Sequence, residues 1–269
     1  MEERKDYKRN DTMKNMNTKR GQVTIFIILA LALIAIIALF FMYPQIKGVG
    51  GIDAIQNPKV YLEKCLEPSL TKLITQLSAN GGDIVPQGFL EYNGQKIKYL
   101  CYTSEYYKTC TVQQPLIKDH FDDVITSEIK NSVQNCMTNL IAEYESKGWS
   151  VSSGESKVSA EIVPNYVDIR IDSPMTLTKD TSRTIKTFDL SFMSNMYEIL
   201  YIATSIVEFE SKLGDAETTA YLNYYPNVRI KKNQLSDGSV IYNIENVITE
   251  ESFTFASRSL PWPPGYGGE

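Results

Sequence analysis

The four cysteines are the residues of this chain most able to form covalent bonds with one another. They lie at positions 65, 101, 110 and 136, all after a long apolar segment near the start of the sequence. If that later part lies outside the cytoplasm, an even number of cysteines favours disulfides, and three pairings are possible. We expect Cys101 to pair with Cys110, closing a short loop, and Cys65 with Cys136, tying two predicted helices together. The alternative is buried free thiols, since cysteine also packs as a small apolar side chain.

Zinc binding and histidine-based catalysis are not expected. The closest cysteine spacing is Cys101-x8-Cys110, and the single histidine is His120. A Ser-His-acid or Cys-His arrangement would have to use His120, which we expect to face solvent early in a helix. We therefore predict no catalytic residue, no metal and no cofactor. A carboxylate pair brought together only by the fold stays an open alternative.

Three aspartates lie close together at the start of the same predicted helix, namely Asp119, Asp122 and Asp123. Their carboxylate oxygens suit calcium, but the segment lacks the glycine and the alternating ligands of an EF-hand loop. Acidic side chains also interact favourably with the positive end of a helix dipole. We expect a solvated helix start rather than a calcium site.

Charge is distributed unevenly along the chain. Residues 1–20 carry seven basic and four acidic side chains, whereas residues 44–269 carry twenty basic and twenty-eight acidic ones, a formal charge of −8. A field of that sign repels phosphate backbones, and the sequence has no basic stripe with interleaved aromatic residues. We expect no nucleic-acid partner.

A transmembrane helix is predicted from Val23 to Tyr43. These 21 residues carry no charge, and a helix of this length reaches roughly 31 Å, close to the ~30 Å hydrocarbon thickness of a bilayer. Seven basic residues precede the segment, but only Lys47 and Lys59 occur in the twenty residues after it. The N-terminus is therefore expected in the cytoplasm and the later chain outside it.

The start of this segment resembles a known processing signal. The run Lys19-Arg20-Gly21-Gln22-Val23-Thr24-Ile25 is similar to the class III signal peptide of archaeal type IV pilin-like proteins, in which a basic leader and a charged residue with Gly precede an apolar helix. The resemblance covers about residues 14–43. It implies that a prepilin-type peptidase cuts between Gly21 and Gln22 and leaves the helix as an anchor.

One position departs from that family. Many such pilins have Glu at the fifth mature position, where Phe26 stands here, and Ser at the third, where Thr24 stands. The missing Glu favours a minor pilin-like protein, or an uncut anchor, over a major filament subunit. The partners that the resemblance implies are the lipid bilayer, the peptidase and other pilin-like or cell-surface proteins.

Apolar periodicity predicts three helices after a linker. The first covers residues 57–80, with an Asn-Pro start, and Pro68 is expected to kink or restart it. The second is a continuous helix of about 30 residues from 117 to 147, ended by Gly148. The third follows an apolar period from residue 193 and ends near Gly214. Its polar residues argue against a second membrane span.

Alternating segments predict hairpins between these helices. Their turns are expected at Asn93-Gly94, Pro164-Asn165 and Asp237-Gly238, and a short apolar strand is expected around Phe253–Phe255. The Pro-rich tail is expected to be extended and partly polyproline-like.

These elements predict an α+β protein: an N-terminal transmembrane helix followed by an extracytoplasmic domain of long helices and antiparallel hairpins. The expected parts are a cytoplasmic leader (1–22), a transmembrane helix (23–43), a linker (44–56), the α+β domain (57–260, with a subdomain split near 148–156 as an option) and a Pro/Gly-rich tail (261–269). The first functional hypothesis is a non-enzymatic surface protein for assembly or attachment. The alternatives are an uncleaved membrane-tethered binding or sensor module and, ranked last, an anchored hydrolase.

Overall fold

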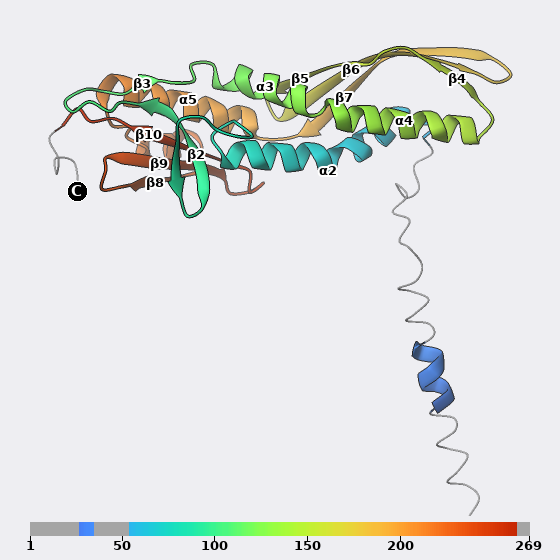
Figure 1. The fold of residues 1–269 in the computed structure, drawn as a ribbon, viewed down its shortest axis with the longest axis horizontal. Coiled ribbons are helices and arrows are strands. Elements are labelled where there is room, and N and C mark those ends of the chain that lie inside the picture. Colours follow the sequence, from blue (N-terminus) through green and yellow to red (C-terminus); the bar gives the residue numbers. More distant parts are fainter. Residues whose placement is uncertain (1–26, 35–53, 263–269) are drawn as a thin grey trace, which may run out of the picture. The chain divides into compact units, whose positions relative to one another are not determined.

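The computed structural model describes residues 27–34 and 54–262 (Figure 1). Residues 27–34 are helical and expose their apolar side chains. The rest of the predicted span Val23–Tyr43, the predicted cleavage residues Gly21 and Gln22, and residues 263–269 lie outside the described part. Among the described residues, no helix has the length and apolarity needed to cross a membrane.

Residues 54–262 belong to one compact unit of mixed α+β structure. The larger of its two sheets has the strand order β1-β2-β10-β9-β8, and β3 pairs with β2. The bounds are β1 (Phe89–Tyr92), β2 (Gln95–Tyr102), β3 (Thr111–Val112), β8 (Val228–Gln234), β9 (Ser239–Asn246) and β10 (Ser252–Arg258).

The sequence predicted purely antiparallel pairing, but this sheet contains both antiparallel and parallel pairs. The hairpins β1–β2 and β8–β9 are antiparallel, with turns at the predicted Asn93-Gly94 and Asp237-Gly238. Asn93 and Gly94 both have positive φ, at 51° and 78°, which fits the tight turn expected of Asn-Gly. In contrast, β2 and β10 pair in parallel. They are far apart in sequence, so no hairpin forces them to run in opposite directions.

The smaller sheet is built around the long strand β6 (Tyr166–Thr178). It pairs with β5 (Lys157–Val163) and β4 (Ser150–Ser153) and with β7 (Ser182–Met193), all antiparallel. The turn between β5 and β6 lies at the predicted Pro164-Asn165. Strand β4 lies in the segment that the sequence offered as a subdomain boundary, and it pairs with the far end of β6.

Strand β7 (Ser182–Met193) was not predicted from the sequence. The predicted third helix began at Met193, but this residue ends β7 and is 86% exposed. Helix α5 begins only at Met196. The alternation of buried Phe188 and Leu190 with exposed neighbours follows the two-residue period of a strand.

The helices are α2 (Pro58–Ala79), α3 (Ile117–Glu128), α4 (Lys130–Ser146), α5 (Met196–Leu213) and α6 (Thr219–Tyr224). Helix α2 begins as predicted, with the Val60 N–H 3.4 Å from the Asn57 side-chain oxygen that accepts its hydrogen bond. The helix continues without interruption through Pro68, so the restart is wrong, and the alternative of a kink at Pro68 stays a prediction. Pro68 is exposed, and water can hydrate the backbone carbonyl that loses its helical partner there.

The predicted long second helix is divided into α3 and α4 by one residue. Ile129 has φ −74° and ψ −15° and forms the junction. The apolar stripe continues across the break, because Ile125, Ile129 and Val133 are all buried. Its periodicity therefore predicted the buried face correctly but gave no signal for the division.

Helix α2 contacts both sheets, through β10 and β7, and lies beside α4 (Figure 1). The Cys65–Cys136 disulfide joins α2 to α4, with the Cα atoms 5.9 Å apart. The Cys101–Cys110 disulfide closes the loop after β2, with a Cα separation of 5.3 Å. The structure thus contains the two pairings chosen from the sequence.

Candidate functional site

A hollow of about 390 Å³ opens at the N-terminal end of α5. Three of its seven lining side chains are tyrosines, and the others are polar apart from one proline. The lining residues are Pro164, Asn165, Asn195, Tyr197, Glu198, Tyr201 and Tyr225. We call this hollow the tyrosine pocket. Its volume lies in the range of sites that bind small molecules or short peptide segments.

The first turns of α5 supply two of the tyrosines. Tyr197 and Tyr201 are four residues apart, so they lie on the same face of the helix. That face points away from the core, because Ile199, Leu200 and Ala203 are buried on the other side. Tyr201 is 63% exposed, which leaves its ring open to a ligand.

The third tyrosine comes from the end of α6. Tyr225 follows this short helix directly. A hydrogen bond of 2.7 Å between the hydroxyls of Tyr221 and Ser205 holds α6 against α5. Burial raises the pKa of Tyr225, and Tyr201 and Glu198 raise it further. Its hydroxyl therefore stays protonated at neutral pH and can donate a hydrogen bond.

The wall formed by the β5–β6 turn is fixed to the start of α5. Asn165 adopts a left-handed conformation, φ 68°, in that turn. Its carbonyl accepts a 3.0 Å hydrogen bond from the Ser194 N–H. The Glu251 carboxylate in turn accepts 2.6 Å hydrogen bonds from the Ser194 hydroxyl and the Asn195 N–H. These contacts position the pocket without using its aromatic rings, which remain available for binding.

The side chains of the tyrosine pocket can stack against a ligand and form hydrogen bonds with it. Tyrosine rings offer flat apolar faces, and their hydroxyls and the amides of Asn165 and Asn195 offer hydrogen-bond donors. Among the described residues of the lining, Glu198 is the one carboxylate, and none is a His, Cys, Lys or Arg. A ligand would be held by stacking and by hydrogen bonds to its acceptor groups.

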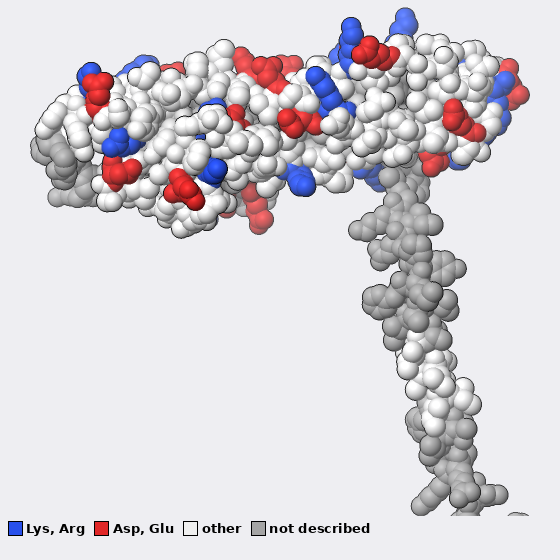
Figure 2. Space-filling model, in the orientation of Figure 1, with Lys and Arg blue, Asp and Glu red and all other residues white. Residues whose placement is uncertain are grey.

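A second hollow, of about 400 Å³, lies between α2 and the end of β7. Its α2 wall carries charged side chains, among them Glu63, Lys64 and Glu67. Figure 2 shows a similar mixture over the visible face of the folded unit, where acidic and basic side chains are interspersed between wide uncharged areas. The charged side chains described in the lining of this groove are three carboxylates, Glu63, Glu67 and Glu251, and one lysine, Lys64.

The sequence predicted that His120 faces solvent, but the structure pairs it with a carboxylate. Its Nε2 lies 2.6 Å from Oδ1 of Asp83, and the side chain is 25% exposed. The other oxygen of Asp83 lies 2.8 Å from the Nζ of Lys98, a residue that is itself 8% exposed. Burial alone would raise the pKa of Asp83, but the hydrogen bonds from Lys98 and His120 outweigh it and hold the pKa below its usual value.

We expect Asp83→Asn to lower the free energy of unfolding by about 1–3 kcal/mol at neutral pH, because Lys98 then keeps a buried charge without its carboxylate. The pKa of Asp83 is lower in the folded state than its ordinary value of 3.8. The stabilisation that the Asp83 carboxylate gives to the folded state is therefore present at neutral pH and is lost as the pH falls below 3.8. Urea titrations of both proteins at several pH values measure the difference. Asp119→Asn, at an exposed position on α3, is the matched control, and an equal loss in both variants would contradict this role.

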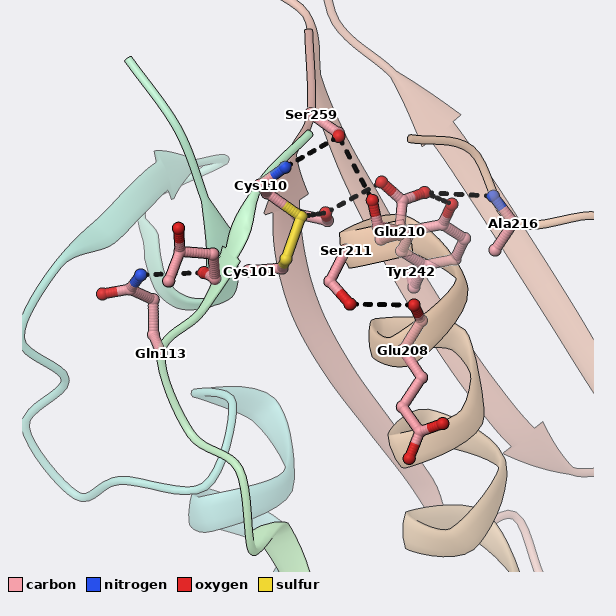
Figure 3. The surroundings of a disulfide bond; sticks show 11 residues. Cys101, Cys110, Gln113, Glu208, Glu210, Ser211, Ala216, Tyr242 and Ser259 are labelled. Atoms are coloured by element: carbon pink, nitrogen blue, oxygen red, sulfur yellow. Dashed lines mark hydrogen bonds between the residues drawn. A yellow bond between two sulfur atoms is a disulfide. The ribbon is translucent and has the colours of Figure 1, made fainter. Parts of the chain in front are cut away.

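Glu210 is the most deeply buried carboxylate among the described residues, at 1% exposed, and it was not predicted from the sequence as a functional residue. It accepts hydrogen bonds from the hydroxyls of Tyr242 and Ser257 and from the Ala216 N–H. Figure 3 shows Glu210 beside the Cys101–Cys110 disulfide. Ser257 on β10 and Ser259 just after it link the two, since each forms a hydrogen bond with Cys110 and another with Glu210. A signal was present, since Glu210 continues the predicted apolar stripe of α5 by three residues from Val207.

The three aspartates of the possible calcium site do not act together. Asp122 accepts a 2.8 Å hydrogen bond from the Ile162 N–H of β5 and pairs with Lys118 at 2.6 Å. It ties α3 to the smaller sheet, which corrects the prediction of a fully solvated helix start. Asp119 is exposed. Within residues 27–34 and 54–262, no group of three or more His, Cys, Asp or Glu side chains is arranged to hold a metal.

All four cysteines are in disulfides, so none offers a thiolate nucleophile. Gly21 and Gln22, the predicted cleavage residues, lie outside the described part. Comparison of the chain with protein-family models, with curated proteins and with solved structures finds no match.

Proposed function

We propose that this protein is a single-pass membrane-anchored surface protein, pilin-like at its N-terminus, whose domain of residues 57–260 is non-enzymatic and serves assembly or attachment. Its N-terminus lies in the cytoplasm and the folded domain lies outside it, on the cell membrane. Its partners are the lipid bilayer, a prepilin-type peptidase that cuts between Gly21 and Gln22, and other pilin-like or cell-surface proteins.

The observation that carries this proposal is the pair of disulfides in the folded domain. Disulfides persist in oxidising compartments outside the cytoplasm. The uncharged segment Val23–Tyr43, with its excess of basic residues on the N-terminal side, supplies an anchor with the matching orientation. An anchored domain that carries an exposed aromatic pocket is suited to contact other molecules at the surface.

The tyrosine pocket also favours a second candidate, an uncleaved membrane-tethered binding module. In this case the leader stays attached and the pocket takes a ligand without assembly of the chain. The two candidates differ in what happens at Gly21.

N-terminal sequencing of protein extracted from its native membrane separates them. We expect the mature chain to begin at Gln22, because the Arg-Gly-Gln junction fits the prepilin cleavage pattern. A Gly21→Leu variant is the control and should keep the leader. An intact start at Met1 in the unaltered protein would remove the pilin-like proposal and leave the tethered binding module.

A further inference from the structure

We propose that the tyrosine pocket binds the Pro-rich segment of a second copy of this chain, residues 263–266. The segment has the sequence Pro263-Pro264-Gly265-Tyr266. This inference rests on the proposed function, since it gives the assembly role a specific contact.

The chemistry of the segment matches the pocket. Proline has no backbone N–H, and its ring fixes φ near that of a polyproline II helix, whose carbonyls have no internal partners. Such a ligand presents apolar rings and hydrogen-bond acceptors. The pocket presents the complement, with the faces of Tyr197, Tyr201 and Tyr225 and donors from hydroxyl and amide groups. Aromatic-lined grooves are a recurring means of binding proline-rich segments.

The pocket of the same chain is out of reach of these prolines. Pro261 packs against Gly214, where an added Cβ would overlap the proline ring. Gly214 caps the C-terminal end of α5, and the pocket lies at the N-terminal end of the same helix. Tyr201 precedes Gly214 by thirteen residues, which corresponds to about 20 Å along a helix. Pro264 is only three residues beyond Pro261, and that stretch spans at most about 11 Å when fully extended.

A contact between the segment of one copy and the pocket of another joins two different surfaces. Such a heterologous contact leaves one free segment and one free pocket in every pair, so it can continue into an open chain of copies. A continuing contact of this kind suits assembly. The close fit of Pro261 on Gly214 also fixes the point from which the segment leaves the folded domain.

The test uses the full chain purified in detergent micelles and studied by sedimentation velocity up to about 100 µM. Two variants are needed: Tyr201→Ala, which removes an exposed ring of the pocket, and a chain truncated after Trp262. We expect the unaltered chain to form species larger than dimers. Each variant alone should associate at least about tenfold more weakly, because the loss falls on a central contact.

Mixing the two variants gives the most specific result. The Tyr201→Ala chain keeps its Pro-rich segment and the truncated chain keeps its pocket, so the mixture should form one-to-one pairs and nothing larger. Phe89→Ala, which removes a partly exposed ring on β1, is the matched control and should behave as the unaltered chain. Unchanged urea midpoints would show that the variants are folded. Tyr197→Ala is a second pocket variant, to be used in place of Tyr201→Ala if that variant does not fold.

Three results would overturn the inference: an unaltered chain that stays monomeric, a truncated chain that associates normally, or a mixture that does not pair. Association that persists without residues 263–269 would point to contacts of the anchor and would leave the proposed function intact. Failure of the chain to anchor in a membrane would instead remove the proposed function, whatever the two variants do.

Discussion

Loss of the Cys65–Cys136 disulfide is expected to lower the free energy of unfolding by about 4 kcal/mol. The two cysteines are 71 residues apart in sequence, and closing a loop of that length removes much of the conformational entropy of the unfolded chain. The bond also joins α2, which contacts both sheets, to α4. The Cys65→Ala/Cys136→Ala double variant, compared with the unaltered chain by urea titration with tryptophan fluorescence, gives the value.

The second disulfide is the internal control for this prediction. Cys101 and Cys110 are only 9 residues apart, so the same loop argument gives a smaller loss of about 2–3 kcal/mol. The order of the two effects is therefore part of the prediction. A loss below about 1 kcal/mol for the Cys65–Cys136 variant would contradict the structural role assigned to that bond.

Truncation of Glu210 is expected to be similarly costly. In Glu210→Ala the hydroxyls of Tyr242 and Ser257 and the Ala216 N–H lose their acceptor inside the core. We expect a loss of about 3–5 kcal/mol in the free energy of unfolding, from these unpaired groups and the cavity that remains. Urea titration measures it. Glu208→Ala, at an exposed position on the same helix, should change the value by less than about 0.5 kcal/mol.

The charge of Glu210 gives this prediction a pH dependence. Burial raises the pKa of Glu210, and the hydrogen bonds from Tyr242 and Ser257 only partly oppose it. A raised folded pKa means that the stabilising contribution is complete below the ordinary value of 4.5 and is lost as the pH rises through the folded pKa. Glu210→Gln carries no charge, so its stability should fall less than that of the unaltered protein between pH 4 and pH 7. Equal slopes for the two proteins would refute a buried, titrating Glu210.

Local signals in the sequence were sufficient for much of the fold. The turn at Asn93-Gly94 depends only on residues that tolerate positive φ, and the start of α2 depends on the cap formed by Asn57. The end of α5 at Gly214 follows from the same freedom of glycine to adopt positive φ, here 83°. Each feature is decided by neighbouring residues, so a single sequence contains the needed information.

Features decided by distant residues were not predictable in this way. The parallel pairing of β2 with β10 joins segments that are far apart in the chain. Strand β7 is a different case, because its partner β6 directly precedes it in an antiparallel hairpin. The pairing of His120 with Asp83 joins residues 37 positions apart. The tyrosine pocket needs α5, α6 and the β5–β6 turn together. The spacing of Tyr197 and Tyr201 was visible in the sequence, but only the fold shows that their rings line a hollow.

Protease treatment of intact cells tests the central proposal most directly. We expect an added protease to cut the predicted linker, residues 44–56, and to release a fragment that contains the folded domain with both disulfides, while a cytoplasmic marker protein stays intact. Mass spectrometry of the released fragment without reduction identifies it. A chain that is cleaved only after the cells are lysed would place the domain inside the cytoplasm and contradict the proposed anchored surface protein.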